Sequence, residues 1–475
     1  MNKSVHLISL GCPKNLVDSE VILAGLSSEG FRPVDQTEKA GIIVINTCCF
    51  IDEAKQESID TILEHVRLKE HDCETLVVCG CLVQRYGKRL VTLLPEVDLF
   101  VGIARMRQLG KILRQFLALA PGKRERIFSI QTSVRAWDEP APRLLSTPQH
   151  YAYVKIADGC SHRCTFCIIP AIRGPYRSRP TADILSEAQG LAENGVREII
   201  LVAQDTGGYG TDREETNFLP DLIKTLAKID GLEWIRILYI HPFRLDPKLL
   251  QTIREEPKCC PYLDIPIQHV SPGVLRRMGR EGGDVRDKLE RVRLLLPDAH
   301  IRTSLLVGFP GETDDEFDEL LKFVKEFRFE SLGVFTYSRE EGTPAAKMKP
   351  QVHHLTRKQR RRRLMEVQAR IVEEKNQHRI GKVFDVMVDG FDDADPRNLI
   401  GRTFFQTPDI DGTVLIPGGA PSHIGRRVKV KIIGSNLYDL IGQVQPSSCH
   451  SSRYTRRDFF DEGHLPVSDR DQLFS

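Results

Sequence analysis

Six strand-like runs between residues 150 and 345 constrain the fold of this 475-residue chain more than any other feature. Each run is short and apolar, and helical segments lie between them, which is the pattern of repeated β/α units around a parallel sheet. Six units are fewer than the eight of the closed α/β barrel, so they predict an open, partial version of that fold. The runs are Tyr151–Ala157, Glu198–Gln204, Trp234–Ile240, Leu263–Gln268, Ile301–Val307 and Leu332–Thr336.

The region before this barrel predicts a second α/β domain. Residues 1–120 alternate short apolar runs with helical patterns, which is typical of a parallel sheet. A polar, proline-containing stretch, 121–149, predicts a linker. The expected strands are Val5–Leu10, Ile42–Ile45 and Leu76–Val78, and the expected helix is Asn15–Glu29.

The region after the six units predicts a third domain and a tail. The barrel and a basic connecting helix, Leu355–Ile380, take up residues 150–380. Five short β-rich runs in 381–446 indicate a small β-barrel of the oligonucleotide-binding-like kind. Residues 447–475 are polar and unpatterned, so we expect them to be disordered.

A compact cysteine motif follows the first run of the barrel. Cys160, Cys164 and Cys167 have the spacing C-x3-C-x2-C, and thiolates are the usual ligands of iron–sulfur clusters. Three ligands satisfy three irons of a 4Fe–4S cluster and leave the fourth open to chelate an amine and a carboxylate, as S-adenosylmethionine (SAM) offers. The alternative is a structural zinc site, which normally needs four ligands and would have to use His162 in poor geometry.

Three further cysteines, Cys12, Cys48 and Cys81, each lie just past an expected N-terminal strand. The carboxyl ends of parallel strands share one edge of the sheet, so the fold would bring these dispersed thiols together. This predicts a second cluster with three cysteine ligands. Cys49 and Cys79 are neighbouring competitors, and we favour Cys48 and Cys81 over them. The alternative is three unrelated core thiols.

The motifs around these cysteines resemble those of the radical SAM methylthiotransferase family. The C-x3-C-x2-C motif is similar to that of the radical SAM superfamily, whose fold is a partial barrel. Gly11–Asn15, Asn46–Cys48 and Gly80–Tyr86 resemble three signatures of the methylthiotransferase N-terminal domain. Residues 381–444 resemble the TRAM domain that ends these proteins, so the resemblance covers residues 3–445.

The resemblance implies an enzyme with two 4Fe–4S clusters and SAM. One cluster would cleave SAM to a 5′-deoxyadenosyl radical, and the other would carry a sulfur that a second SAM methylates before it joins a substrate carbon. The resemblance also implies that Phe166 lies beside the SAM adenine. Gln204 and Asp205 are candidate contacts of the SAM ribose or amino group. Gly308 and Gly311 would let the backbone approach SAM, and a simple turn is the alternative for them.

Family members act on a tRNA adenosine or on a ribosomal protein. Gly11–Glu20, Ile172–Gly174, Ser178–Pro180 and Tyr262–His269 resemble the second branch. This implies methylthiolation of the β-carbon of an aspartate in small-subunit ribosomal protein S-twelve, with an electron donor such as flavodoxin or ferredoxin. A tRNA methylthiotransferase is the near alternative. A non-enzymatic iron–sulfur or zinc protein that binds RNA is the alternative from another class.

The charge of the third domain is an independent indication of the substrate. Residues 381–446 carry seven Lys or Arg and eight Asp or Glu, whereas a barrel that grips RNA should be basic. A neutral-to-acidic barrel better suits a basic ribosomal protein. The block Arg360–Arg363 points the other way, and we interpret it either as a contact to ribosomal RNA or as a solvated helix face.

The chain as a whole carries a net charge of +2 and has no apolar run of membrane-spanning length. The apolar stretch Val5–Leu10 is too short for a signal peptide and has no basic lead-in. We therefore expect a cytoplasmic protein without a membrane partner.

Overall fold

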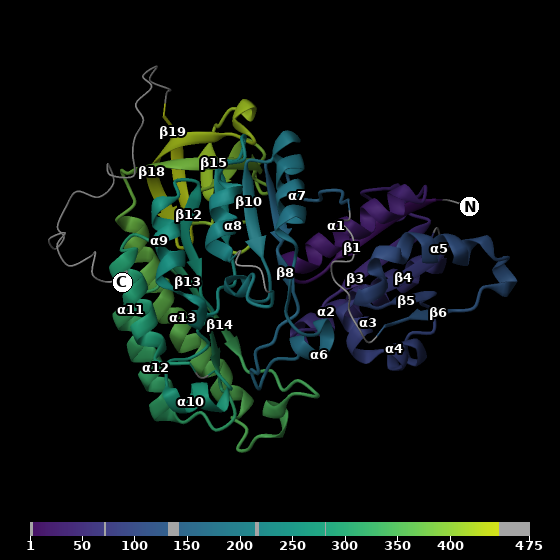
Figure 1. Cartoon of the computed structure of the whole chain (residues 1–475), viewed down its shortest axis with the longest axis horizontal. Coiled ribbons are helices and arrows are strands. Elements are labelled where there is room, and N and C mark those ends of the chain that lie inside the picture. Colours follow the sequence, from purple (N-terminus) through teal and green to yellow (C-terminus); the bar gives the residue numbers. More distant parts are fainter. Residues whose placement is uncertain (1–2, 71–72, 132–141, 214–217, 281, 446–475) are drawn as a thin grey trace.

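The computed structural model describes residues 3–70, 73–131, 142–213, 218–280 and 282–445. An N-terminal sheet domain lies beside a partial barrel, and a small closed barrel covers one end of that partial barrel (Figure 1). The predicted disordered tail, 447–475, lies outside the described residues, as does the 132–141 part of the predicted linker.

The N-terminal domain is a parallel sheet with the strand order β2-β1-β3-β4-β5-β6. β3 is buried at every position because both faces of the sheet are covered, which explains its unbroken apolar sequence. The sheet continues past residue 120, because β6 pairs with β5 inside the segment that we predicted as a linker. The strands are β1 (Ser4–Ser9), β2 (Arg32–Pro33), β3 (Ile42–Thr47), β4 (Thr75–Gly80), β5 (Leu99–Val101) and β6 (Ile127–Ser129). The helices are α1 (Pro13–Ser28), α2 (Asp52–Val66), α3 (Cys81–Tyr86), α4 (Lys88–Leu93) and α5 (Leu109–Ala118).

The central domain is a sheet of six parallel strands in the order β14-β13-β12-β11-β10-β7, which confirms the predicted open barrel. Its strands are β7 (Tyr151–Lys155), β10 (Glu198–Val202), β11 (Trp234–Ile237), β12 (Cys259–Asp264), β13 (His300–Val307) and β14 (Ser331–Thr336). A short antiparallel pair, β8 (Ala157–Asp158) and β9 (Arg177–Ser178), follows the first strand. The helices are α6 (Ile169–Arg173), α7 (Thr181–Glu193), α8 (Leu219–Leu226), α9 (Pro247–Glu255), α10 (Pro272–Arg277), α11 (Val285–Leu295) and α12 (Asp314–Phe327).

Alternate residues of the barrel strands pack in two different cores, because successive side chains of a strand point to opposite faces. Ile199 of β10 packs in the core beneath the surrounding helices. Ile200 belongs instead to a second core, where it is grouped with Val17 of α1 and Met387 of the C-terminal barrel. The inner face of the partial barrel is therefore filled from the two neighbouring domains, and this packing holds α1 at the barrel.

The C-terminal domain is a closed barrel of the strands β15-β16-β17-β19-β18, as predicted. The long helix α13 (His354–Gln377) leads into it. The strands are β15 (Val383–Phe391), β16 (Asn398–Arg402), β17 (Val414–Pro417), β18 (Arg427–Asn436) and β19 (Asp439–Val444). Among the described helices, none combines the length and the apolar character that crossing a membrane requires.

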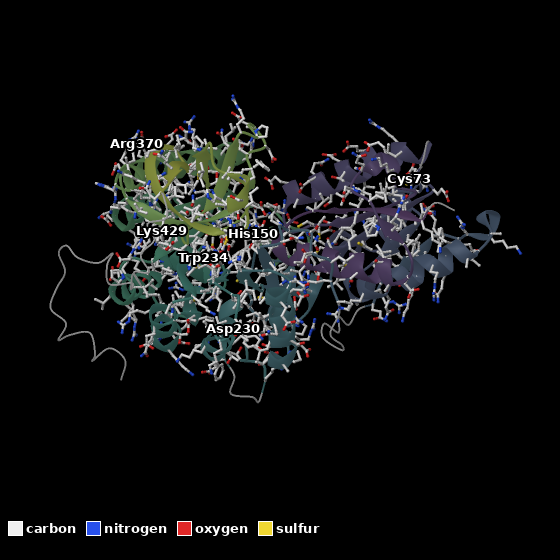
Figure 2. The ribbon with its side chains drawn as sticks, turned by 90° about the horizontal axis from the view of Figure 1, so that it is seen from above. Cys73, His150, Asp230, Trp234, Arg370 and Lys429 are labelled. Atoms are coloured by element: carbon white, nitrogen blue, oxygen red, sulfur yellow. The ribbon has the colours of Figure 1, made fainter. Side chains whose placement is uncertain are left out.

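A buried ion network joins the partial barrel to the C-terminal barrel. The carboxylate of Glu198 lies 2.7 Å from Arg236 and 2.7 Å from Arg402, and these three side chains are at most 2% exposed. Arg402 also pairs with Asp389, and Nε2 of His150 lies 2.8 Å from the same carboxylate. In Figure 2, His150 lies where the two barrels meet. Because removing one member leaves a buried charge unpaired, this network fixes the two domains to each other.

The Arg360–Arg363 block on α13 does not form one solvated face. Arg360 is only 4% exposed and forms ion pairs with Glu312, at 2.9 Å, and with Asp314, at 2.7 Å. The interpretation of the block as a solvated face is therefore wrong for Arg360, because that position of the helix faces α12 and the loop before it. Arg362 is exposed and forms an ion pair with Glu366 of its own helix.

Candidate active site

Cys160, Cys164 and Cys167 lie in the loop between β8 and α6, past the end of the first barrel strand. All three are half-buried. Burial above all, and the neighbouring thiols as well, raise the pKa of Cys160 to about 11 and that of Cys167 to about 12. Such thiols stay protonated at neutral pH until a bound metal displaces the proton. Nη1 of Arg280 lies 3.7 Å from the sulfur of Cys164 and adds a permanent positive charge beside the set.

His162, the residue that would complete a zinc site, is engaged elsewhere. Its Nε2 lies 2.7 Å from Oδ2 of Asp205, and its ring stacks on that of His241 with 4.1 Å between the centroids. Asp205 also accepts a hydrogen bond from the backbone N–H of His241. Within the described ranges, no three His, Cys, Asp or Glu side chains are arranged to hold a single metal ion. The contacts of His162 therefore disfavour the zinc alternative.

Cys12, Cys48 and Cys81 follow β1, β3 and β4, which are neighbours in the N-terminal sheet. Gly11 lies so close to Cys48 that a Cβ on it would be 2.8 Å from the Cys48 sulfur, and its φ of +91° favours glycine. Burial first, and then the thiols of Cys81 and Cys12, raise the pKa of Cys48 to about 12. The fold thus brings the three dispersed thiols to one sheet edge.

The two competing cysteines face the core of the domain. Cys49 and Cys79 are both 0% exposed, whereas Cys81 is 8% exposed and Cys12 and Cys48 are half-buried. An iron–sulfur cluster bound at the edge of the N-terminal sheet would contact the more exposed thiols rather than the fully buried ones. The geometry thus favours Cys48 and Cys81, and their role as iron ligands stays a prediction.

Arg173, at the end of α6, spans the gap between the two cysteine sets. Its Nη2 lies 3.5 Å from the sulfur of Cys81 and 2.9 Å from Asp18 of α1. Its Nη1 lies 3.0 Å from Asp158, two residues before Cys160. One guanidinium therefore contacts a thiol of one set and the chain leading into the other.

The same cation affects the first thiol of the N-terminal set. Burial opposes ionisation of Cys12, but the positive charges of Lys14 and Arg173 outweigh it and lower the pKa of Cys12. The environment of this thiol thus favours a thiolate, the form that binds metals.

Comparisons with known proteins match all three domains. Residues 4–102 match the uncharacterized protein family UPF0004, 154–324 match the radical SAM superfamily, and 380–444 match the TRAM domain. The chain is 46% identical over 450 residues to the ribosomal protein uS12 methylthiotransferase RimO of Acetivibrio thermocellus, which covers 94% of this chain and 99% of that protein. It is also 46% identical to the RimO of Geotalea uraniireducens, with the same coverage. The chain belongs to the RimO family of radical SAM methylthiotransferases.

A solved structure shares the arrangement of much of this RimO-family chain. The radical S-adenosylmethionine methyltransferase TsrM from Kitasatospora setae superposes with a TM-score of 0.54 at 15% identity. The match covers 73% of this chain and 77% of TsrM, whose structure holds cobalamin and a 4Fe–4S cluster. At this identity the likeness concerns the fold alone.

The residues predicted to contact SAM lie in the cysteine loop and at a strand end of the RimO-family barrel, and they have contacts within the protein. Phe166 packs against a small apolar core that includes Phe309. Nε2 of Gln204 donates to Asp158 at 3.0 Å, while its Oε1 is buried without a partner among the described residues. Asp205 orients His162 and His241, as described above. Contact of these residues with SAM stays a prediction.

Gly308 and Gly311 are required by the local backbone. Their φ angles are +73° and +74°, and a Cβ on Gly308 would come within 2.0 Å of the side chain of Arg357. The N–H groups of Gly308 and Phe309 donate to the carboxylate of Glu312 at 2.5 and 3.0 Å. The positive φ angles and the hydrogen bonds of this turn explain why glycine occupies both positions, as the turn alternative expects. Close approach of the backbone to SAM stays a prediction.

Lys14 lies between the N-terminal domain and the barrel. Its Nζ is 3.4 Å from the centroid of the Tyr239 ring, just past β11. Sequence reasoning assigned no role to Lys14, Arg173 or Arg280. The spacing Cys12-x-Lys14 is the only local signal for Lys14, and Arg173 was noted only as part of a motif.

Proposed function

We propose that this protein adds a methylthio group to the β-carbon of an aspartate in small-subunit ribosomal protein uS12. The observation that carries the proposal is the position of the two three-thiol sets on either side of Arg173. RimO proteins, to which the chain is similar over nearly its whole length, are named for the methylthiolation of uS12.

The two donor sets fit two 4Fe–4S clusters, each with one iron left open. Cys160, Cys164 and Cys167 offer three thiols in one loop, and Cys12, Cys48 and Cys81 offer three at one sheet edge. When bound, the first cluster with SAM supplies a radical that takes hydrogen from an unactivated carbon, and the second supplies the sulfur. Arg280 and Arg173 each lie beside a sulfur and offset part of the negative charge of three thiolates.

Two buried polar atoms in the segments that follow β10 and β12 support a bound SAM molecule. Oε1 of Gln204 and Nε2 of His269 have no hydrogen-bond partner among the described residues. Buried polar groups are nearly always satisfied, so a ligand with matching groups accounts for both atoms. Burial lowers the pKa of His269 to about 3, so the ring is neutral. Because its Nδ1 accepts the backbone N–H of Ser271 at 3.0 Å, Nε2 carries the proton and offers a hydrogen-bond donor to a ligand.

The proposed chemistry also defines the partners and the compartment. The first cluster must be reduced, which a low-potential electron donor such as flavodoxin or ferredoxin would do. Because the substrate belongs to the ribosome, we place the enzyme in the cytoplasm. The exposed basic side chains of α13, Lys358 and Arg362 among them, would contact ribosomal RNA if uS12 is modified on the small subunit.

Anaerobic reconstitution tests the proposal. The purified protein is loaded with iron and sulfide, then incubated with SAM, a reductant and uS12, and mass spectrometry follows the target aspartate. We expect one methylthio group on that aspartate and none on uS12 whose target aspartate is replaced by asparagine. Unmodified uS12 together with a methylthioadenosine in added tRNA would overturn the proposal.

A further inference from the structure

The amine of Lys14 forms no ion pair with a carboxylate of the described residues, although Cys12, Asp264 and Asp158 lie close enough to favour its charged form against the effect of burial on its pKa. Its Nζ lies over the face of Tyr239, and no described residue forms an ion pair or a hydrogen bond with it. A cation–π contact is worth about 0.5–2 kcal/mol and leaves the N–H donors of an ammonium group open to a better acceptor.

The neighbouring cations are already committed to carboxylates. Arg173 and Lys155 both pair with Asp158, and Arg302 pairs with Asp264 at 3.1 Å. Among these positive charges at the junction of the two domains, only Lys14 has an aromatic ring in place of a carboxylate. An incoming carboxylate would therefore meet the amine of Lys14 without breaking an ion pair to another carboxylate.

The structure holds Lys14 between the N-terminal cysteine set and the barrel. Lys14 lies in the first turn of α1, whose N-cap residue is Cys12. Tyr239 comes from the opposite side, at the carboxyl end of the barrel strand β11, and the amine over its ring joins the two domains. A group bound to this amine lies beside the N-terminal set and at the mouth of the barrel.

The backbone of Tyr239 is held in an unusual conformation that aims its ring at Lys14. Its φ is +63°, in the left-handed region that costs a non-glycine residue roughly 1–2 kcal/mol. Its N–H donates to Asp264 at 3.2 Å and its carbonyl accepts from Thr206 at 2.9 Å, which fixes this conformation. Strained residues of this kind concentrate at functional sites.

We propose that Lys14 binds the side-chain carboxylate of the substrate aspartate and thereby holds its β-carbon between the two cysteine sets. This role rests on the proposed function. The β-carbon is bonded directly to the carboxylate carbon, so a charge-assisted contact of about 2.8 Å fixes the position of the carbon that reacts. The ring of Tyr239 supports the ammonium group from the opposite side and excludes water from it.

Binding of two forms of uS12 tests this role. The reconstituted holoenzyme is titrated with SAM and without reductant, so that no turnover occurs, against uS12 and against uS12 with its target aspartate replaced by asparagine. A hydrogen bond to a charged group corresponds to about 10-fold or more in Kd. We expect the wild-type enzyme to bind the aspartate form about 10-fold tighter, the Lys14→Met variant to lose this preference, and Lys14→Arg to keep it.

The matched control is Lys88→Met, which removes an exposed lysine of the same domain and should preserve the preference. A wild-type enzyme that binds both forms of uS12 equally would overturn the role of Lys14, whatever the variants do. A Lys14→Met variant that holds wild-type iron and keeps the preference would overturn it as well. The proposed function fails by a different result, namely a wild-type enzyme that leaves uS12 unmodified.

Discussion

Nη2 of Arg173 lies 3.5 Å from the sulfur of Cys81, although the two residues belong to different domains. The same guanidinium pairs with Asp158 on the barrel side and with Asp18 on α1. Arg173 is only 2% exposed, and these charges raise its pKa well above the ordinary value even though burial opposes this. One permanently charged side chain therefore links the N-terminal cysteine set to the segment that leads into the barrel set.

Replacing Arg173 should disturb the link between the two cysteine sets and thereby lower activity. We expect Arg173→Gln to lower methylthio transfer by about 10–100-fold, because it removes a group that orients a thiol. It should also destabilise the fold, by up to about 3–5 kcal/mol, because the buried Asp158 loses one of its two cationic partners and keeps only Lys155. Activity assays and urea unfolding measure the two effects. Arg197→Gln is the matched control, since Arg197 pairs with Glu233 while 42% exposed and should cost less than about 1 kcal/mol.

The two cysteine sets should be separable by their chemistry. Wild-type protein should bind about eight irons, and both Cys160→Ala and Cys12→Ala should bind about four. Cys160→Ala should abolish reductive SAM cleavage, whereas Cys12→Ala should keep cleavage and lose methylthio transfer. Iron analysis and detection of 5′-deoxyadenosine measure these outcomes.

Cys73→Ala supplies the control for both variants. Cys73 is a buried thiol that lies in the N-terminal domain (Figure 2). It donates to the carbonyl of Thr75. This variant should keep all of the iron. Methylthiolation that persists in Cys12→Ala would contradict the sulfur-carrying role of the N-terminal set.

Exposure should decide between neighbouring thiols. We expect Cys48→Ser and Cys81→Ser each to lose the N-terminal cluster, and Cys49→Ser and Cys79→Ser to retain it, because the latter two side chains face the core. Electron paramagnetic resonance of the reduced proteins would show one cluster signal or two. Loss of the second signal in Cys49→Ser with retention in Cys48→Ser would reverse the assignment.

The sequence predicts most of this fold because its signals are local and periodic. The barrel strand Tyr151–Lys155 and the helix His354–Gln377 agree with their predicted ranges within a few residues. The short strand Ile127–Ser129 was missed because it has three residues and lies in a polar segment, where its pairing with β5 decides its conformation.

The contacts that join the domains could not be predicted in the same way. Arg360 lies in a run of four arginines, yet its burial against Glu312 depends on how α13 docks on the barrel. Lys14 and Tyr239 are 225 residues apart in the chain, and only the packed structure brings them together. The convergence of Cys12, Cys48 and Cys81 could be predicted, because each of them follows a strand and the carboxyl ends of parallel strands lie at the same edge of the sheet.

The buried network between the two barrels should dominate the stability of their interface. Glu198→Gln removes a charge that holds two fully buried arginines, so we expect it to destabilise the protein by about 3–5 kcal/mol. Arg362→Gln, on the exposed face of α13, should cost less than about 1 kcal/mol. Urea unfolding measures both, and equal effects of the two substitutions would contradict the importance of the network.

The contribution of Glu198 to the free energy of unfolding should also depend on pH. Burial raises its pKa, but Arg402 and Arg236 outweigh this and hold the pKa of Glu198 below its ordinary value of 4.5. A carboxyl group whose pKa is lower in the folded state stabilises the protein above the unfolded-state pKa and loses that effect as the pH falls through the folded-state pKa. The difference in unfolding free energy between wild type and Glu198→Gln should therefore be constant above about pH 5 and shrink on acidification below about pH 4.5. Arg362→Gln should show no such trend over this range, since arginine does not titrate there. A difference for Glu198→Gln that grows on acidification would mean that the buried carboxyl group is protonated in the native protein and that the arginines are held by other partners.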